Sequence, residues 1–519
     1  MLVTTAISYT NGDPHIGHMF EAILADVYQR WKRAYLSETH VRFLTGTDEH
    51  GQKVQKTAQA AGCQNTKGYC DMCSSVFKST CDKFSISYDR FIRTTDPDHK
   101  EIVEIFMDLC KDDIYLGEYR GWYNAREETF VSESDAASAG FVDIVSGKPL
   151  TKMQEPSYFF KLSKYQAEVK EFLLANPNFI TPATLQQEIL TRLEKPLEDL
   201  SISRISVEWG IPFPTDPTHT VYVWFDALVN YITGACHFDI PETDVYHIIG
   251  KDILWFHTVI WLSMLSSASL KPPTRILAHG FVCDADGKKM SKSLGNVVSP
   301  IELLKKYSSD AIRSYFVTNF TPTNDFHFAE NALIRHHDSV LLADYGNLIQ
   351  RSLGLFHKFA TVKTDSGSVV PDVAFAVKLF DIPKVLHELD EIISQFQFGQ
   401  FAERIWKLVF QLNTYVNETC IWTLGERTEN DRQIVLKTLI EGVYILNHFV
   451  GAIIPESSVK IFTLLGKSSK THFCELTWQN FEVHSVVPKH NGIVVFTALD
   501  QEMVQKRKEK NITKKGNKQ

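Results

Sequence analysis

The stretch that decides the fold is residues 7–31, ISYTNGDPHIGHMFEAILADVYQRW. It starts at the end of a short apolar run at 2–9, LVTTAISY, which is typical of a β-strand and is broken by the turn sequence Asn-Gly-Asp-Pro at 11–14. From 16 to 31 the apolar side chains recur at helical spacing, and a second strand-like run follows at 40–46. Strand, long helix and strand predict a βαβ unit, and therefore a parallel sheet with a right-handed crossover.

Two histidines stand at the start of the predicted helix. His15 and His18 flank Ile-Gly just after the first strand, and TGTDEHG ends the second strand. Parallel sheets bind ligands at the carboxyl ends of their strands, and a helix N-terminus offers free N–H groups to an anion. Two imidazoles there can donate hydrogen bonds to phosphate oxygens, and Gly17 would let a base or ribose approach the backbone. The arrangement predicts a site for a nucleoside triphosphate.

Composition is that of an ordinary globular protein with several domains. The 519 residues are 44% hydrophobic and 22% charged, and the formal net charge of -8 gives no overall sign of nucleic-acid binding. Nine irregularly spaced cysteines favour a reducing compartment over a disulfide framework. The early strand leaves no room for a signal or transit peptide, and the apolar run at 253–270 contains His257 and several serines, which favours a buried helix over a membrane span. We expect a cytoplasmic protein with no membrane association.

The remaining sequence divides by pattern. Residues from about 109 to 214 are mixed and polar, which indicates an inserted domain, and strand patterns return at THTVYVWF and VYHIIG. After 331 the apolar period is almost entirely helical and predicts a helix bundle. The basic end at 501–519 is either a solvated, disordered tail or a weak RNA contact.

A lysine-containing loop provides a second chemical signal. In the sequence KMSKS at 289–293, Lys289 and Lys292 could neutralise the β- and γ-phosphates as pyrophosphate leaves. HIGH at 15–18 combined with KMSKS resembles the class I aminoacyl-tRNA synthetases, and the sequence from 1 to 465 resembles the methionyl-tRNA synthetase family among them. The resemblance extends over TGTDEHG, SYFFKLSKYQ, LSISR, WGIP, YVWFDALVNY, IIGKDILWFH, AHGF, GNVVSP and GNLIQRS.

The resemblance implies three groups of site residues. A methionine pocket is expected, with Asp48 binding the substrate ammonium, from Ile7, Tyr9, Asp48, Trp224, Ala227, Tyr231, Phe256, His257 and Trp261. ATP contacts are expected from His15, Gly17, His18, Gly250, Lys251, Asp252, Lys289 and Lys292, of which the two histidines and Lys289 and Lys292 are the catalytic residues. Anticodon bases are expected to contact Asn347, Arg351 and Trp422, although Ile421 replaces the proline that the family usually has before this tryptophan.

Simpler roles remain open for several of these residues. Asp48 could cap a helix N-terminus, Lys251 could be an ordinary surface residue, and Trp261 could be plain core. Asn347 and Arg351 could be a surface polar pair. A thioether, however, packs well against aromatic walls, which agrees with a methionine pocket.

The resemblance also implies a fold, partners and a division of the chain. The expected fold is α/β, a Rossmann-like parallel-sheet catalytic domain with a connective insertion, followed by an all-α anticodon-binding helix bundle. The expected boundaries are 1–108 and 215–270 for the two halves of the catalytic domain, 109–214 for the insertion, 271–330 for a stem-contact region with the KMSKS loop, 331–500 for the anticodon-binding domain and 501–519 for the tail. The expected substrates are L-methionine, ATP with Mg²⁺, and initiator and elongator tRNA(Met) with a CAU anticodon. Because the chain ends shortly after the bundle, we expect a monomer.

The cysteines suggest a zinc site that other features argue against. Cys70-Asp-Met-Cys73 falls on one face of a predicted helix, which favours buried small hydrophobic side chains over a zinc knuckle. Many members of the family have a zinc knuckle in the insertion, but here GWYNAREETF has Asn124 and Glu127 at the cysteine positions. No cysteine occurs between Cys110 and Cys236, so we expect an insertion without zinc.

Two other functions remain as alternatives. A class I synthetase for valine, isoleucine or leucine would need a larger editing insertion, and one for cysteine would be expected to use zinc. A non-catalytic tRNA-binding paralogue would have no need of both HIGH and KMSKS.

Overall fold

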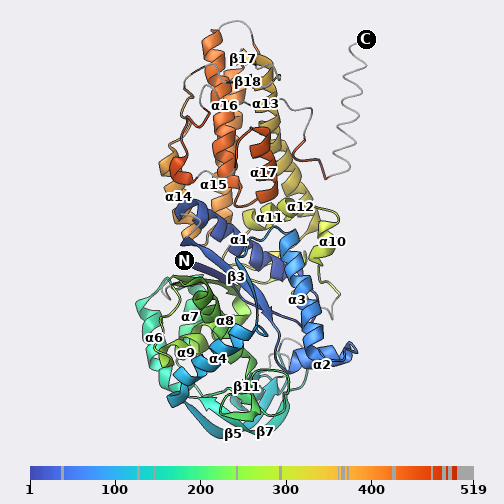
Figure 1. Cartoon of the computed structure of the whole chain (residues 1–519), viewed down its shortest axis with the longest axis vertical. Helices are drawn as coiled ribbons and strands as arrows, with labels where there is room; N and C mark the ends of the chain where they lie inside the picture. The colour runs from blue at the N-terminus through green and yellow to red at the C-terminus, as the bar shows by residue number, and fades with distance from the viewer. Residues whose placement is uncertain are drawn as a thin grey trace. The chain divides into compact units, whose positions relative to one another are not determined.

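The computed structural model describes residues 1–36, 40–124, 129–131, 133–144, 147–240, 244–290, 295–360, 362–363, 367, 369–370, 373, 375–423, 428–468, 472–481, 487–488 and 494–499. The chain forms two compact units (Figure 1). Unit 1 comprises Met1–Ala25, Arg42–Asp82 and Ile86–Phe281, and unit 2 comprises Asp26–Val41, Lys83–Ser85 and Val282–Gln519. Helix α1 (Ile16–Leu36) contributes residues 16–25 to unit 1 and 26–36 to unit 2.

Unit 1 is built on a parallel sheet. Its described strands follow the order β2-β3-β1-β13-β14-β8, and β4 pairs with β3. Every one of these pairings is parallel. The bounds are β1 (Leu2–Thr5), β2 (Ser8–Tyr9), β3 (Arg42–Asp48), β4 (Arg90–Arg93), β8 (Ile180–Thr181), β13 (Val245–Gly250) and β14 (Arg275–His279). The predicted βαβ unit is therefore confirmed, with the strand expected at 2–9 divided into β1 and β2.

Helices flank this sheet. They are α2 (Gln52–Ala60), α3 (Thr66–Lys83), α4 (Pro97–Leu109) and α8 (Val223–Phe238), followed by the 3-10 helix η4 (Lys251–Ile253), the π-helix η5 (Phe256–Ile260) and α9 (Trp261–Ser267). Helix α8 packs directly on the sheet, since a Cβ atom on Gly234 would lie 2.5 Å from Cδ2 of Leu44. The buried helix predicted at 253–270 is present, but its first part is wound as a π-helix.

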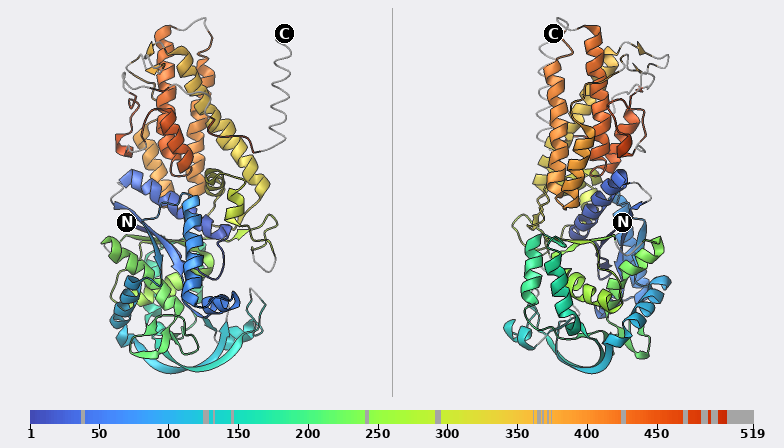
Figure 2. Two further views of the ribbon diagram at one scale, coloured as in Figure 1. Left: turned by 45° about the vertical axis from the view of Figure 1, so that its right-hand side comes forward. Right: turned by 90° about the vertical axis from the view of Figure 1, so that its left-hand side faces the viewer.

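The inserted region adds two antiparallel sheets (Figure 2). The first has the order β6-β5-β7-β9 and the second has the order β10-β12-β11. Their bounds are β5 (Ile114–Asn124), β6 (Thr129–Val131), β7 (Thr151–Phe160), β9 (Leu200–Ser201), β10 (Ser203–Arg204), β11 (Pro212–Phe213) and β12 (Asp216–Val221). The helices of this region are η2 (Lys111–Asp113), α5 (Glu133–Ser138), η3 (Leu162–Tyr165), α6 (Gln166–Ala175) and α7 (Ala183–Arg192). Strand β8 comes from the same stretch of sequence but joins the parallel sheet beside β14.

Unit 2 is mainly helical. Its core is formed by α13 (Asn347–Phe359), α15 (Phe398–Thr419) and α16 (Glu429–Val450), which pack on one another, and α14 (Ile382–Ser394) packs on α15. Its other helices are α10 (Pro300–Leu304), α11 (Ser309–Thr318), α12 (Glu330–His336), the π-helix η6 (His337–Gly346), α17 (Pro455–Leu464) and η7 (Phe473–Glu475). Two short strand pairs, β15 (Val282–Cys283) with β16 (Phe326–His327) and β17 (Val362–Lys363) with β18 (Val369–Val370), accompany them. The parallel-sheet domain, the insertion and the helical C-terminal region are thus confirmed. Nowhere in the described chain is a helix both long enough and apolar enough to cross a membrane.

One buried ion pair organises the interior of unit 2. Arg313, on α11, is fully buried and donates hydrogen bonds to the Asp26 carboxylate (2.7 Å) and to the carbonyls of Ile453 (2.9 Å), Ala452 (3.0 Å) and Phe84 (3.1 Å). Its guanidinium therefore joins four segments that are far apart in the sequence. A buried charge of this kind is tolerated only when all its hydrogen bonds are satisfied.

Replacing Arg313 by Met should destabilise unit 2 strongly, because the Asp26 carboxylate and three carbonyls lose a buried donor. We expect the free energy of unfolding to fall by about 3–5 kcal/mol, measured by urea denaturation. Lys407→Met is the control: the Lys407 side chain is 66% exposed and forms a surface pair with Glu403. An equal loss in both variants would contradict the role assigned to Arg313.

Candidate functional site

The loops that follow the central strands lie at one edge of the unit 1 sheet. Strand β1 lies between β3 and β13, so the strand order reverses at β1, and this is the position where open parallel sheets bind ligands. The polar segments that leave this edge are the Asn-Gly-Asp-Pro turn, the end of TGTDEHG, the Gly-Lys-Asp segment at 250–252 and the end of β14 at His279. The sequence predicted that these motifs follow strands and lie at one edge of the sheet, and the strand topology places them there.

The two histidines of HIGH are held by the start of α1. The rings of His15 and His18 stack with centroids 3.7 Å apart, and His18 also meets the edge of Phe77 from α3. The backbone N–H of His15 donates to Nδ1 of His18, and that of Gly17 donates to Nδ1 of His15, both at 3.1 Å. A neutral imidazole whose Nδ1 accepts carries its proton on Nε2. Each ring can therefore donate from Nε2 to an anion.

The structure gives a further reason for a glycine at position 17. A Cβ atom at this position would lie 3.0 Å from two atoms of the His15 ring. The glycine therefore makes room for the stacked imidazole, in addition to any approach of a ligand to the backbone.

The aromatic residues of the predicted pocket form two contact pairs. Trp224 of α8 stacks on Phe256 of η5, with centroids 3.8 Å apart and planes 8° apart. Seven residues further along α8, the Tyr231 hydroxyl donates to Nε2 of His257 at 2.7 Å. The ring nitrogen Nε2 is the acceptor because Nδ1 of His257 carries the proton and donates to the Ile253 carbonyl at 3.0 Å. The π-helix thus presents consecutive side chains to two different residues of α8.

The histidine and tyrosine side chains of this pocket are neutral. Burial lowers the pKa of His257 to about 4 and raises the pKa of Tyr231 well above its ordinary value. The neighbouring His247 of β13, whose ring lies 4.1 Å from that of Tyr231, also has a pKa well below the ordinary histidine value because of burial. An uncharged, aromatic lining of this kind suits a thioether side chain.

The other predicted pocket residues lie in the same unit. Ala227 is buried on α8, while Ile7 and Tyr9 are partly buried and pack on the core of unit 1. Trp261 is 2% exposed and contacts Phe106 as well as Tyr231, each at 6.0 Å between centroids, so it is part of the core as well as a neighbour of the pocket.

Asp48 ends β3 and is buried at 4% exposure. Its partner in the sheet register is Tyr9, and its carbonyl accepts the backbone N–H of Thr10 at 3.0 Å. The alternative role as a helix N-cap is wrong, because the N-cap of α2 is Gly51. A carboxylate buried at the carboxyl edge of the sheet suits an ammonium group.

The Gly-Lys-Asp segment continues the same edge. Gly250 ends β13, Lys251 and Asp252 form the start of η4, and the Lys251 ammonium lies 4.7 Å from the centre of the Phe281 ring. Asp252 is exposed. These are positions from which a polar ligand at the edge can be reached.

Sequence reasoning missed a partly buried pair at this edge. His279 of β14 donates from Nε2 to the Glu21 carboxylate of α1 at 3.1 Å, and the other Glu21 oxygen accepts the backbone N–H of Ala6 at 3.1 Å. Burial raises the pKa of Glu21, whereas for His279 the interaction with Glu21 outweighs burial and raises the pKa. The motif AHGF contained the signal, but the 258 residues between the partners hid the pair.

Lys289, the first residue of the predicted lysine loop, belongs to unit 2. Lys289 forms an antiparallel bridge with Cys283. Lys292 lies outside the described residues.

The predicted anticodon residues gather on unit 2. Asn347 is exposed at the start of α13, and the Arg351 guanidinium donates to the Asn417 side chain at 2.8 Å. The same guanidinium lies 5.9 Å from the centre of the Trp422 ring, which is 43% exposed, while the preceding Ile421 is buried. A half-exposed indole beside an arginine is suited to stacking a nucleobase.

The cysteines of α3 line its buried face, as their spacing predicts. Cys70 and Cys73 are buried, and burial raises the pKa of the Cys70 thiol to about 12. Among the described residues no group of three or more His, Cys, Asp and Glu side chains has the geometry of a metal site. Asn124 donates to Asp143 at 3.2 Å, and Glu127 lies outside the described part of the chain.

The low pKa of His257 makes stability depend on pH. Because the unfolded chain binds this proton near pH 6.5 and the folded chain only near pH 4, the free energy of unfolding should decrease as the pH falls through this window. His257→Gln should flatten the decrease by up to about 1.4 kcal/mol per pH unit, measured by urea denaturation between pH 4.5 and 7. The control is His237→Gln, at an exposed histidine of α8, which should leave the slope unchanged. An unchanged slope in His257→Gln would show that this imidazole is not held neutral.

The chain is similar to proteins of one family along most of its length. The family described as tRNA synthetases class I (M) matches residues 1–139 and 140–353. The methionine–tRNA ligase of Fusobacterium nucleatum is 39% identical over 478 residues, which cover 89% of this chain and 74% of the relative. That of Synechocystis is 36% identical over 484 residues, covering 89% of each chain.

Solved structures agree with the sequence comparison. The Mycobacterium tuberculosis methionyl-tRNA synthetase in complex with methionyl-adenylate matches with a TM-score of 0.84 and 34% identity, over 95% of this chain and 99% of that one. The apo form of the same enzyme matches with a TM-score of 0.78 and 31% identity. From the site geometry, the family match and these likenesses together, the chain belongs to the class I tRNA synthetases for methionine, the family of the methionine–tRNA ligases.

Proposed function

We propose that this chain activates L-methionine with ATP and transfers the methionyl group to tRNA(Met), in initiation and in elongation. The observation that supports this most strongly is the neutral aromatic lining built by Trp224, Phe256, Tyr231 and His257 in the same unit as the Asp48 carboxylate. A flexible thioether fits such walls by dispersion and sulfur–ring contacts, and the carboxylate matches the ammonium.

In the proposed first step, methionine reacts with ATP at the carboxyl edge of the sheet. Asp48 binds the ammonium, and the methionine carboxylate oxygen attacks the α-phosphorus. A new bond forms between that carboxylate oxygen and the α-phosphorus, the bond from the α-phosphorus to the bridging oxygen breaks, and pyrophosphate leaves with that electron pair. The step needs no side-chain nucleophile, so positioning and charge neutralisation are the main contributions of the protein.

Charge neutralisation is assigned to two groups of residues. His15 and His18 donate from Nε2 to phosphate oxygens at the N-terminus of α1, and Gly17, Gly250, Lys251 and Asp252 bind the rest of ATP. Lys289 and Lys292 of the KMSKS loop neutralise the departing pyrophosphate, where Mg²⁺ carried by ATP would supply further positive charge.

In the proposed second step, the terminal ribose hydroxyl of the tRNA attacks the methionyl carbonyl. The bond between that carbonyl and the phosphate oxygen breaks, AMP leaves, and the hydroxyl proton is released. Asn347, Arg351 and Trp422 select the tRNA by its CAU anticodon, with the indole stacking on a base and the polar side chains contacting base edges.

The remaining proposals concern metal content and organisation. The insertion is proposed to fold without zinc, because no cysteine lies between Cys110 and Cys236 and Asn124 hydrogen-bonds Asp143 where a thiolate ligand would be expected. The domain boundaries, the monomeric state and the cytoplasmic location expected from the sequence stay predictions.

Exchange of labelled pyrophosphate into ATP, measured with each amino acid in turn, tests the proposed reaction. Methionine alone should support exchange, and His18→Ala should slow it by about 100- to 1,000-fold through loss of one phosphate donor. Exchange with valine, isoleucine, leucine or cysteine would reassign the substrate. No exchange with any amino acid would support a non-catalytic tRNA-binding protein.

Removing the indole of Trp422 should weaken tRNA selection without touching amino acid activation. Since stacking contributes about 1–3 kcal/mol per base, we expect Trp422→Ala to lower kcat/KM for aminoacylation of tRNA(Met) by about 10- to 100-fold, with pyrophosphate exchange unchanged. Phe410→Ala is the matched control, because Phe410 is another exposed aromatic residue of unit 2, at 70% exposure. If aminoacylation survives Trp422→Ala, the stacking role is wrong.

A further inference from the structure

Three consecutive ionisable residues at the end of β3 are buried. Asp48 is 4% exposed, Glu49 is 0% exposed and His50 is 2% exposed. Acidic side chains are almost never fully buried unless they are paired. Asp48 is the residue proposed to bind the ammonium, so the partners of the two residues that follow it decide how firmly its backbone is held.

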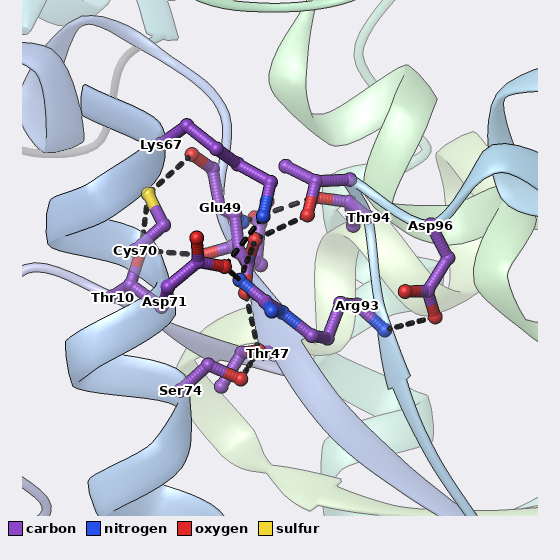
Figure 3. Close-up of polar contacts among 12 residues, drawn as sticks. Thr10, Thr47, Glu49, Lys67, Cys70, Asp71, Ser74, Arg93, Thr94 and Asp96 are labelled. Carbon is purple, nitrogen blue, oxygen red and sulfur yellow. Dashed lines mark hydrogen bonds and ion pairs between the residues drawn. The ribbon is translucent and has the colours of Figure 1, made fainter. Parts of the chain in front are cut away.

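Glu49 is anchored by an arginine from the neighbouring strand (Figure 3). Arg93 of β4 donates to both carboxylate oxygens, at 2.6 and 2.9 Å, and Thr95 donates to one of them at 2.6 Å. The Arg93 guanidinium also reaches Asp71 of α3 at 2.5 Å. The bidentate geometry fixes Glu49 in both position and orientation.

His50 is anchored to α8, the helix that carries Trp224 and Tyr231. Its Nδ1 donates to one oxygen of Asp226 on α8 at 2.6 Å. The other Asp226 oxygen accepts from Nε2 of His99 on α4 at 2.8 Å, and Nδ1 of His99 contacts the Thr233 hydroxyl of α8 at 2.9 Å. Burial alone would raise the pKa of Asp226, but its interactions with His50 and His99 lower that pKa to about 2. The carboxylate is therefore charged, and both of its oxygens are used.

Asp226 lies between the pocket residues in the sequence of α8. Trp224 precedes it by two positions, Ala227 follows it directly, and Tyr231 lies five positions on. The hydrogen bond between His50 and Asp226 therefore links the segment that carries Asp48 to α8, whose Trp224 and Tyr231 form what we call the aromatic wall.

Stability alone is a weak reason for this cluster. A buried ionic group can often be replaced by apolar residues of similar volume with little loss of stability, because desolvation offsets the attraction between the charges. What apolar packing lacks is direction: the hydrogen bond from His50 fixes where the β3 end stands relative to α8, and the bond from His99 of α4 holds the same carboxylate in place.

Resting on the proposed function, we propose that Asp226, acting through His50, is a positioning residue that sets the distance between the ammonium-binding carboxylate of Asp48 and the aromatic wall of α8. The Arg93–Glu49 pair holds the same segment from the side of β4. Methionine bridges the two positions, with its ammonium on Asp48 and its side chain against α8, so displacement of one against the other weakens methionine binding selectively. ATP binding is left largely unchanged.

The test is the separation of KM values for methionine and ATP in pyrophosphate exchange by the full chain. Asp226→Asn keeps the shape of the side chain. It replaces one of the two accepting oxygens with an NH₂ group, which is a donor and therefore cannot accept the imidazole N–H that faces it. We expect KM for methionine to rise about 10- to 100-fold, the effect of a displacement of roughly 1 Å, with KM for ATP changed less than about twofold.

A pair of substitutions at His50 provides a second test, which does not depend on whether Asp226→Asn folds. His50→Asn retains an N–H near the position of Nδ1 and should leave KM for methionine close to that of the wild type, whereas His50→Leu should raise it as Asp226→Asn does. Asp113→Asn is the matched control: Asp113 is a buried carboxylate of unit 1 held by Lys164, Tyr165 and Ser267. It should reduce stability without moving KM for methionine.

Other results would overturn the positioning role. If KM for methionine is unchanged in Asp226→Asn and His50→Leu, the cluster serves stability alone. The same holds if kcat falls only in proportion to the fraction of enzyme molecules that remain active. A parallel rise of both KM values would also reject it. Failure of the wild-type chain to exchange with methionine would instead reject the proposed function, so the two failures are distinguishable.

Discussion

The candidate site depends on the parallel pairing of β1 with β3 on one side and with β13 on the other. Parallel strands all end at the same edge, and β1 lies where the order of the sheet reverses. The histidines that follow β1 and β2, the carboxylate that ends β3 and the Gly-Lys-Asp segment that ends β13 therefore reach one edge, although more than 230 residues separate the first from the last. An antiparallel sheet would distribute the same residues between opposite edges.

Charge in this site is controlled by tautomers and burial more than by net charge. His15 and His18 have their Nδ1 atoms occupied by backbone N–H groups, which leaves Nε2 as the donor without requiring a second proton. His257 and His247 are kept neutral by burial. The charged groups of the edge, such as Glu21 with His279 and Glu49 with Arg93, are paired. The formal charge of -8 reveals none of this arrangement.

Sequence patterns were informative where the physical cause is local. The period of 16–31 and the turn before it predict α1, and the spacing of Cys70 and Cys73 predicts a helix face, because both patterns depend on neighbours within a few turns. They were not informative about pairs between distant segments. Asp226 with His50 and His279 with Glu21 join residues 176 and 258 positions apart, and no local pattern contains that distance. The break between β1 and β2 within the strand expected at 2–9 was also missed, although both parts pair with β3.

The π-helix η5 has a consequence for how this chain can vary. An α-helix advances about 100° per residue, and a π-turn accommodates one residue more in each turn. That additional residue lets the adjacent side chains Phe256 and His257 meet Trp224 and Tyr231, which lie seven positions apart on α8. Loss of a single codon from this segment would restore regular α-helical winding and remove the extra residue that lets both neighbours face α8. The segment is therefore free to exchange side chains of similar shape in evolution, but its length is fixed.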